Sequence, residues 1–203
     1  GGVKCWGAND SGQLGDGSTT PRQTPTQVPG LSGIVALSLG EFHTCALDTA
    51  GRAYCWGYGS HGQLGDGTSN SRATPALVAG GHTFRSLHAS KYHTCGVTTA
   101  DRAYCWGNNY LGQVGDGTLS FRSTPMELAS TVSWALLGGG MGQNHTCGLA
   151  TTGKVYCWGG QRTGELGIGS WGVERAPVLV KGGITFRPPA VPPGEGHEEP
   201  APR

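Results

Sequence analysis

The stretch HTCALDTAGRAYCWG, from His43 to Gly57, decides the fold of this chain. Closely similar stretches run from His93 to Gly107 and from His145 to Gly159. The cysteines of the four Cys-Trp-Gly motifs, Cys5, Cys55, Cys105 and Cys157, are 50, 50 and 52 residues apart. A period of this length indicates an array of similar units, so the repeat has to be understood before any single element.

Two further landmarks recur in step with this stretch. A glycine-rich loop follows each Cys-Trp-Gly motif and reads GQLGDG, GQLGDG, GQVGDG and GELGIG, from Gly12, Gly62, Gly112 and Gly164. A proline then follows each loop, at Pro25, Pro75, Pro125 and Pro177. Glycine supplies 38 of the 203 residues, and a chain rich in both glycine and aromatic residues is typical of short strands joined by tight turns.

The repeated stretch has the pattern of a β-hairpin. Pairing Cys45 with Cys55 leaves residues 49–51 as the loop, with Gly51 where such a loop needs a left-handed backbone. If the pair that closes this loop is hydrogen-bonded, alternation makes 45–55 a non-hydrogen-bonded pair, whose Cα atoms lie about 4.5–5.5 Å apart, within disulfide reach. Spacing of ten residues with a single histidine nearby does not match a zinc site. The predicted disulfides are Cys45–Cys55, Cys95–Cys105 and Cys147–Cys157.

The opposite face of the hairpin carries the large aromatic rings. Tyr54 is expected opposite Ala46, and Trp56 opposite Thr44, so that a small residue faces each ring. One unit alone has nothing to cover this face, so the units must stack. Four short strands per unit at this period predict an all-β fold, a β-propeller of four-stranded antiparallel blades, with the proline-bearing strand at an edge. The expected blade-packing residues are Trp6, Trp56, Trp106, Trp158, Tyr54, Tyr104 and Tyr156.

The combination HTCAL, AYCWG, GQLGDGT and Thr-Pro resembles the repeat of the regulator of chromosome condensation family. The resemblance covers nearly everything from Gly2 to Arg187. It implies a propeller, and complete members of the family are typically seven-bladed rings. This chain has four Cys-Trp-Gly strands but only three His-Thr-Cys strands, so we expect about three and a half to four blades in a partial or open ring. Self-association would be one way to complete such a ring.

The expected domain of tandem repeats spans residues 1–187, and the individual repeats cover about 5–54, 55–104, 105–156 and 157–187. The segment 188–203 carries six prolines and no aromatic residue. Because that composition buries too little apolar surface to order a chain, we expect a disordered tail or linker there.

Cysteine usage predicts the compartment. Disulfides persist in oxidising surroundings, so three of them indicate an extracellular or periplasmic protein. Cys5 is the odd cysteine, and by periodicity its partner would lie ten residues earlier, which indicates a chain that starts inside a repeat. A buried free thiol is the alternative for Cys5.

Charge and hydropathy exclude two classes of partner. The chain has 14 Lys and Arg against 13 Asp and Glu, for a net charge of +1. Phosphate binding needs a clustered excess of basic residues, so nucleic acid is not an expected partner. No apolar run approaches the ~18 residues of a membrane span, so membrane insertion is not expected either.

Residues that suggest chemistry are mostly part of the repeat. His43, His93 and His145 recur at one blade position, which favours a structural hydrogen-bonding role over a metal site. The loop aspartates Asp16, Asp66 and Asp116 suggest calcium, but the fourth copy has Ile168 and no second carboxylate recurs at ligand spacing. The glycine loops lack the Lys-Ser/Thr ending of a phosphate-binding loop, and no serine-nucleophile motif is present. We therefore expect no enzyme activity, no metal and no cofactor.

Specificity is expected where the repeat is broken, because loops at the ends of blades project from a constant scaffold. Such breaks fall just after Cys-Trp-Gly and just before His-Thr-Cys, and Glu41, Lys91, Gln143 and Asn144 are among them. Ordinary variation of exposed turns is the alternative explanation. The residues predicted to contact a partner are Phe42, Tyr58, His61, Tyr92, Asn109, Tyr110 and Trp171.

The resulting hypothesis is a non-catalytic, exported propeller that serves as a scaffold for binding another protein. The resemblance also implies two alternatives. One is guanine-nucleotide exchange on a small GTPase, the activity of the founding family member. The other is inhibition of a secreted enzyme by binding to it, as one secreted bacterial member of the fold does.

Overall fold

A computed structural model describes residues 2–138 and 144–188 of the chain, and these residues form strands and turns only. The strands are β1 (Val3–Gly7), β2 (Arg22–Val28), β3 (Ile34–Leu39), β4 (His43–Asp48), β5 (Ala53–Gly57), β6 (Arg72–Leu77), β7 (Phe84–Ala89), β8 (His93–Thr98), β9 (Ala103–Gly107), β10 (Arg122–Glu127), β11 (Trp134–Gly138), β12 (His145–Ala150), β13 (Val155–Gly160) and β14 (Val173–Leu179). Over the described ranges there is no helix that could cross a membrane.

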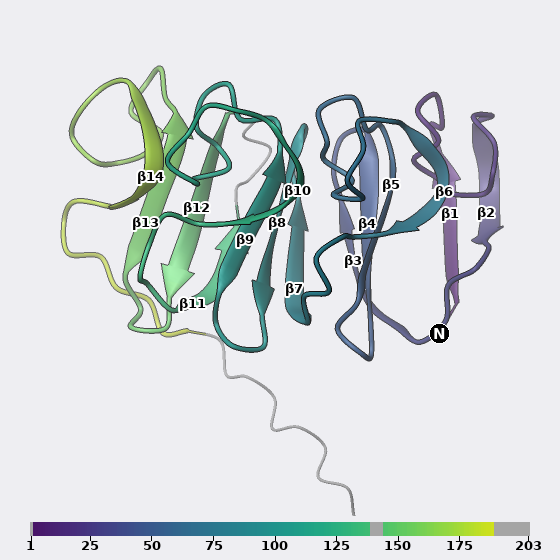
Figure 1. Ribbon diagram of the computed structural model, residues 1–203, viewed down its shortest axis with the longest axis horizontal. Helices are drawn as coiled ribbons and strands as arrows, with labels where there is room; N and C mark the ends of the chain where they lie inside the picture. Colours follow the sequence, from purple (N-terminus) through teal and green to yellow (C-terminus); the bar gives the residue numbers. More distant parts are fainter. Residues whose placement is uncertain (1, 139–143, 189–203) are drawn as a thin grey trace, which may run out of the picture.

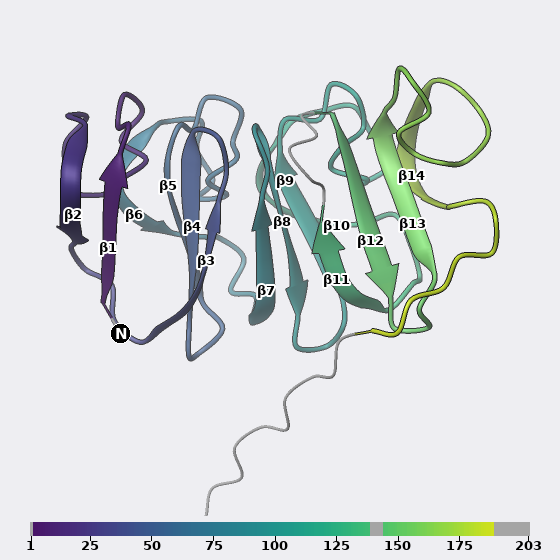
Figure 2. The same cartoon turned by 180° about the vertical axis from the view of Figure 1, so that it is seen from behind.

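The strands form three complete blades and one half-blade. The sheets β3-β4-β5-β6, β7-β8-β9-β10 and β11-β12-β13-β14 are four-stranded and follow the chain order, and β1 pairs with β2 alone. Figures 1 and 2 show the four sheets side by side in a row, with β1 and β2 at one end and β11 to β14 at the other. The predicted propeller of four-stranded antiparallel blades in an open ring is confirmed, at three and a half blades.

The predicted hairpin register is confirmed in all three complete blades. Cys45 pairs with Cys55, Ala46 with Tyr54 and Thr44 with Trp56, and the other two hairpins repeat this register. The backbone N–H of Asp48 donates to the carbonyl of Arg52 at 3.1 Å, which closes the loop as expected. The three predicted disulfides are present, each with Cα atoms 4.1 Å apart.

The core lies between the blades, where the indoles of Trp56, Trp106 and Trp158 pack on the glycine loop of the preceding blade. Trp106 is fully buried, and its Nε1 donates to the Gln63 carbonyl at 3.0 Å. A Cβ on Gly65 would lie 2.6 Å from that Nε1, so the loop needs glycine there. Trp56 and Trp158 make the equivalent bonds to the carbonyls of Gln13 and Gln113. The indoles thus fill the inter-blade space, and Tyr54, Tyr104 and Tyr156 lie half-buried beside these clusters.

Trp6 departs from this pattern. It was predicted to pack between blades, but 60% of its surface is exposed. The other three indoles pack on the glycine loop of the preceding repeat. The packing role of Trp6 stays a prediction.

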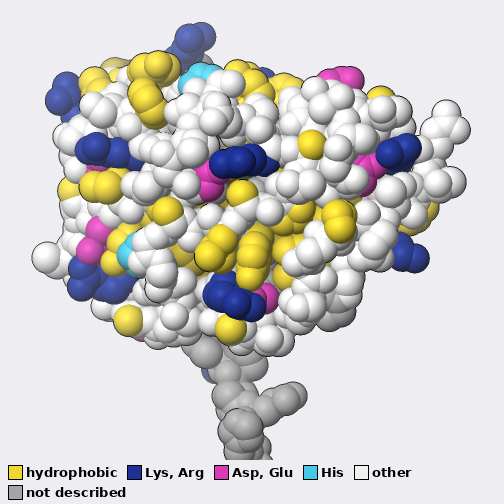
Figure 3. Space-filling model, turned by 45° about the vertical axis from the view of Figure 1, so that its right-hand side comes forward, with side chains coloured by type: hydrophobic (Ala, Val, Ile, Leu, Met, Phe, Trp, Pro, Cys, Tyr) yellow, Lys and Arg dark blue, Asp and Glu magenta, His cyan; other side chains and the backbone are white. Residues whose placement is uncertain are grey.

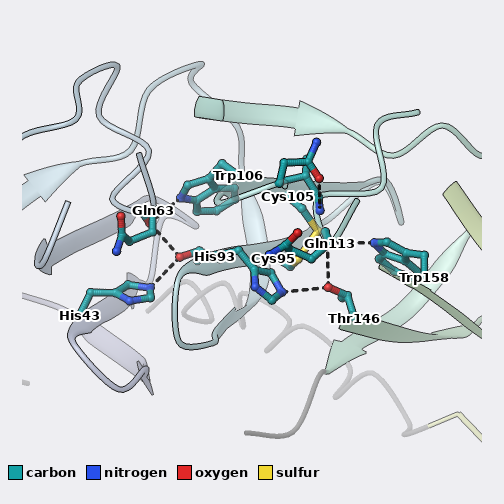
Figure 4. Close-up of a disulfide and its surroundings, with 12 residues drawn as sticks. His43, Gln63, His93, Cys95, Cys105, Trp106, Gln113, Thr146 and Trp158 are labelled. Carbon is teal, nitrogen blue, oxygen red and sulfur yellow. Dashed lines mark hydrogen bonds between the residues drawn. A yellow bond between two sulfur atoms is a disulfide. The ribbon is translucent and has the colours of Figure 1, made fainter. Parts of the chain in front are cut away.

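Buried hydrogen bonds join neighbouring blades around the repeated histidines. His93 Nε2 lies 2.9 Å from Thr146 Oγ1, and that hydroxyl donates to the Gln113 carbonyl at 2.8 Å. Figure 4 shows His93, Thr146, Gln113 and Trp158 joined in this succession beside the Cys95–Cys105 disulfide. These contacts agree with a structural role for His93.

The surface mixes both signs of charge. The loop aspartates pair with arginines, Asp16 with Arg22 at 2.7 Å and Asp116 with Arg122 at 2.6 Å. Figure 3 shows several basic side chains beside acidic ones, with hydrophobic side chains exposed between them. The predicted tail 188–203 lies outside the described residues from position 189 onward.

Candidate functional site

Five of the predicted contact residues come together in one cluster of rings. Phe42 precedes β4, Tyr58 and His61 follow β5, Tyr92 precedes β8 and Tyr110 follows β9. All five therefore lie at the same end of the blades, the upper edge in Figure 1, where the long loops gather. These five residues form an aromatic cluster. The aromatic cluster spans the junction between the blade β3–β6 and the blade β7–β10.

The rings of the aromatic cluster are in direct contact with one another. Phe42 stacks on Tyr92 with ring centroids 5.9 Å apart, and His61 lies 5.1 Å from Tyr92. Tyr58 lies 6.3 Å from both Phe42 and Tyr92. Tyr110 meets the edge of His61 at 6.4 Å and is 63% exposed. Rings that hold each other in place offer contact area to a partner at a small entropic cost.

Backbone hydrogen bonds fix the loops that carry these rings. The N–H of Tyr58 donates to the Phe42 carbonyl at 2.8 Å, and the N–H of Asn108 donates to the Tyr92 carbonyl at 2.8 Å. The His61 N–H donates to Oε1 of Gln63, a buried residue of the glycine loop. The repeated parts of the sequence therefore fix the backbone conformation of these loops, and the residues at the variable positions carry the aromatic rings.

A charged pair borders the aromatic cluster on the side of Phe42 and Tyr92. The Lys91 ammonium lies 3.0 Å from the Glu41 carboxylate. It also lies 5.4 Å from the Phe42 ring centre and 5.3 Å from that of Tyr92, within cation–π distance of both. The Lys91 side chain is only 16% exposed, whereas Glu41 is 47% exposed, so the carboxylate is the more accessible charge.

A hollow of about 430 Å³ adjoins this charged pair. Glu41 and Lys91 line it together with residues from the ends of β3 and β7, namely Leu39, Gly40, His88, Ala89 and Ser90. Sequence reasoning missed this hollow. The signal was available at His88, because the corresponding positions of the neighbouring repeats hold Ser38 and Gly138.

Asn109 was predicted to contact a partner, and this prediction is wrong. The residue is fully buried, its Oδ1 accepts from the Val114 N–H at 2.9 Å, and its Nδ2 donates to the Ser120 carbonyl at 3.0 Å. These hydrogen bonds hold the glycine loop together from its buried side. Asn9 occupies the same repeat position with the same bonds, and this recurrence was the signal that separates Asn109 from the variable residues.

The remaining predicted positions lie apart from the aromatic cluster. Trp171 is 74% exposed in the loop before β14, in the blade at the other end of the row. No ring contact joins it to another described residue. Asn144 precedes β12, and Gln143 lies outside the described residues.

The polar groups that suggested metal chemistry are occupied in structural contacts. The hydrogen bond from the Ser18 hydroxyl, followed by that from Arg22, lowers the pKa of Asp16 to about 2. Burial lowers the pKa of His43 and of His93 to about 3, so both imidazoles are neutral at physiological pH. Among residues 2–138 and 144–188, no group of three His, Cys, Asp or Glu side chains is placed to hold a metal ion.

Two family models match the sequence, and both describe the regulator of chromosome condensation (RCC1) repeat. One matches residues 1–47 and 50–97. The other matches residues 34–63, 84–113 and 140–165. Together they cover all four Cys-Trp-Gly units and well over half of the chain.

The fold is similar to solved RCC1-type propellers. Prp20p from Saccharomyces cerevisiae, described with its binding to Gsp1p and histones, superposes with a TM-score of 0.77 at 21% identity, over 90% of this chain and 47% of that one. The same yeast protein bound to Kap60 gives a TM-score of 0.75 at 23% identity, over 91% and 46%. Human WBSCR16 gives 0.72 at 20% identity, over 85% and 46%. The chain thus spans about half the length of these proteins.

Proposed function

Because this chain belongs to the regulator of chromosome condensation (RCC1) repeat family, we propose that it is a non-catalytic module that binds another protein through its aromatic cluster. The observation that carries the proposal is the meeting of Phe42, Tyr58, His61, Tyr92 and Tyr110 across one blade junction. The core of the blades is formed by the repeated indoles, whereas these five rings lie outside that core and are partly or largely exposed.

The chemistry of the aromatic cluster suits a protein surface. Tyrosine and histidine combine apolar area with hydrogen-bonding atoms, and tyrosine is enriched among residues that dominate binding energy. The Glu41 carboxylate and the Lys91 ammonium at its border add a charge pattern that a partner has to match. The fold neighbour Prp20p binds proteins, as its description with Gsp1p, histones and Kap60 states, which supports the same class of partner here.

We further propose that the protein works in an oxidising compartment, outside the cell or in a periplasm. Three disulfides at equivalent positions of three blades support this location, because reducing cytosol keeps such pairs open.

A binding experiment with matched aromatic variants tests the function. The purified chain is immobilised, proteins retained from extracellular or periplasmic extract are identified, and the affinity of each purified candidate is then measured. Tyr58→Ala and Tyr92→Ala should each weaken binding about tenfold or more. Phe186→Ala serves as the control, because Phe186 is also exposed, at 57%, but lies next to Gly153 at the hairpin end of the last blade.

The outcomes separate the proposal from its alternatives. If the variants Tyr58→Ala, Tyr92→Ala and Phe186→Ala all bind the partner as tightly as the unchanged chain does, the binding surface lies elsewhere. Release of labelled nucleotide from a small GTPase on addition of the chain would replace a purely binding role by nucleotide exchange.

A further inference from the structure

A tripeptide at the tip of the blade β11–β14 has the pattern of an N-glycosylation acceptor. The chain reads Asn-His-Thr from Asn144 to Thr146, which matches Asn-x-Ser/Thr with no proline in the middle. The His-Thr pair belongs to the repeat, whereas the residue before it varies and is Phe42, Tyr92 or Asn144 in the three copies. An acceptor asparagine therefore stands in the third copy at the position that holds a ring of the aromatic cluster in the other two.

The structure places Asn144 at the same tip as those two rings. Its carbonyl accepts from the N–H of Gly160 at 2.7 Å, just as the Phe42 carbonyl accepts from the N–H of Tyr58. The residue directly precedes β12, at the upper edge in Figure 1, and is partly exposed. Within the part of the chain that the structure describes, the Asn144 side chain makes no hydrogen bond. Its amide is therefore available for modification.

A glycine beside Asn144 leaves room next to this amide. Tyr58, the counterpart of Gly160, places its ring 6.3 Å from that of Phe42, whereas Gly160 has no side chain to place there. A hollow of about 510 Å³ adjoins the amide, and its lining includes Leu111, Asn144, Gly160, Gln161 and Arg162. The hollow can take the first sugar of a glycan, whose hydroxyl groups would meet polar side chains.

A second tripeptide of this pattern, from Asn9 to Ser11, is closed by the fold. Asn9 is fully buried in its glycine loop. Its Nδ2 donates to the carbonyls of Ser18 and Thr20 at 3.0 and 3.1 Å, so both amide hydrogens are in use. A glycan would replace one of these hydrogens and would not fit inside the loop. The two tripeptides are therefore a matched pair, one accessible and one closed.

We propose that Asn144 is the acceptor of an N-linked glycan, attached as the chain passes through a eukaryotic secretory pathway. The inference rests on the oxidising compartment proposed above, and it does not depend on the aromatic cluster as a binding surface. Such glycans are bulky and lie on the surface. Leu111 lines the hollow beside Asn144 and follows Tyr110 in the sequence, so the glycan borders the aromatic cluster on the side of Tyr110. It thereby confines a partner to the junction between the blades β3–β6 and β7–β10.

The glycan is transferred from an oligosaccharide that is carried on a lipid diphosphate. Nδ2 of Asn144 attacks C1 of the first sugar, the bond from Nδ2 to C1 forms, and the bond from C1 to the diphosphate oxygen breaks. Nδ2 loses one proton, and the lipid diphosphate leaves. The Thr146 hydroxyl, which is part of the recognised tripeptide, is buried in the folded chain and donates to the Gln113 carbonyl at 2.8 Å. The transfer therefore precedes the closure of this blade.

Secretion of the whole chain from cultured eukaryotic cells, behind a cleavable signal peptide, tests the proposal. Intact mass is measured before and after a peptide N-glycosidase, which converts the glycosylated asparagine to aspartate, and peptide mapping locates the conversion. We expect one glycan, on Asn144, in more than half of the secreted chains and none on Asn9. Unmodified Asn144 in secreted chains whose three disulfides are closed would overturn the proposal. Because the same masses count the closed disulfides, a failure of the proposed compartment is seen separately.

Two variants separate the position at the blade tip from the tripeptide itself. Asn144→Gln should lose the glycan, and its melting temperature should equal that of the enzymatically deglycosylated chain. Tyr92→Asn creates the same tripeptide at the equivalent tip of the preceding blade, so the number of glycans should rise from one to two. Two other results would overturn the proposal: a glycan that persists in Asn144→Gln, or a glycan on Asn9 in folded, secreted chains.

Discussion

His43 in β4 lies 2.8 Å, from Nε2 to Oγ1, from Thr94 in β8 of the next blade. The Thr94 hydroxyl donates its own hydrogen to the Gln63 carbonyl at 2.8 Å, so it accepts from His43, and the imidazole proton is on Nε2. His93 and Thr146 repeat this arrangement one blade further on. These buried bonds connect blades that share no backbone hydrogen-bond ladder, so they contribute directly to the cohesion of the array.

Replacing Thr94 by valine should lower the free energy of unfolding by about 1–3 kcal/mol, because a buried imidazole N–H then has no acceptor. Urea denaturation at neutral pH measures the change. Thr99→Val, at an exposed threonine in the loop of the same β8–β9 hairpin, is the control, and its free energy of unfolding should stay within about 0.5 kcal/mol of that of the unchanged chain. If Thr94→Val loses no more free energy of unfolding than Thr99→Val does, the inter-blade hydrogen bond contributes nothing to stability.

Stability should fall as the pH is lowered from about 6.5 toward 3. Burial holds the pKa of His43 and of His93 at about 3 in the folded chain, against about 6.5 when unfolded, so the unfolded state binds more protons in this window. For each pH unit that the pH is lowered in this window, each of the two histidines lowers the free energy of unfolding by about 1.4 kcal/mol. Urea titrations between pH 6 and 4.5 should show a shallower slope for His93→Gln than for the unchanged chain, and identical slopes would contradict the prediction.

Gly65→Ala should destabilise the chain by about 3 kcal/mol or more, because the new methyl group would overlap the buried Trp106 indole. Its Cβ would lie 2.6 Å from Nε1 of that indole, at a backbone φ of +71°. Gly81→Ala is matched in backbone, with φ +63°, but its Cβ would meet nothing within 4 Å. Thermal denaturation should therefore show that Gly81→Ala loses only about 1–2 kcal/mol of stability, the cost of an alanine in a left-handed backbone conformation. Equal losses for the two variants would remove the steric argument.

In denaturant without reductant, a thiol reagent should modify one cysteine, Cys5, and after reduction it should modify all seven. Intact mass spectrometry counts the labels. The double variant Cys95→Ser/Cys105→Ser should lose about 2–3 kcal/mol of stability, since the cross-link restricts the unfolded chain. More than one label before reduction would mean that a disulfide is open.

Asn109→Ala should reduce stability by about 2–3 kcal/mol while leaving the affinity for a partner unchanged, because the side chain is buried in the glycine loop. Asn70→Ala, at an exposed asparagine of the second loop, is the control for stability. A loss of affinity in folded Asn109→Ala protein would restore Asn109 to the contact residues.

The sequence by itself determined whatever depends on contacts within one hairpin. The pairing of Cys45 with Cys55 follows from a loop of fixed length and from the two-residue alternation of strands, and both are local properties. The repeat period then determined the blade architecture, since the same local solution occurs three times. Local rules suffice here because the residues involved are ten positions apart.

The tertiary structure alone decided which variable residues meet and which are buried. Phe42 stacks on Tyr92 although fifty residues separate them, and this contact depends on how two blades are set against each other. Asn109 and Tyr110 are neighbours in sequence, yet one is enclosed by the glycine loop and the other is exposed. The burial of Trp56, Trp106 and Trp158 depends on the glycine loop of a neighbouring blade. Such packing between blades is long-range, and no local pattern specifies it.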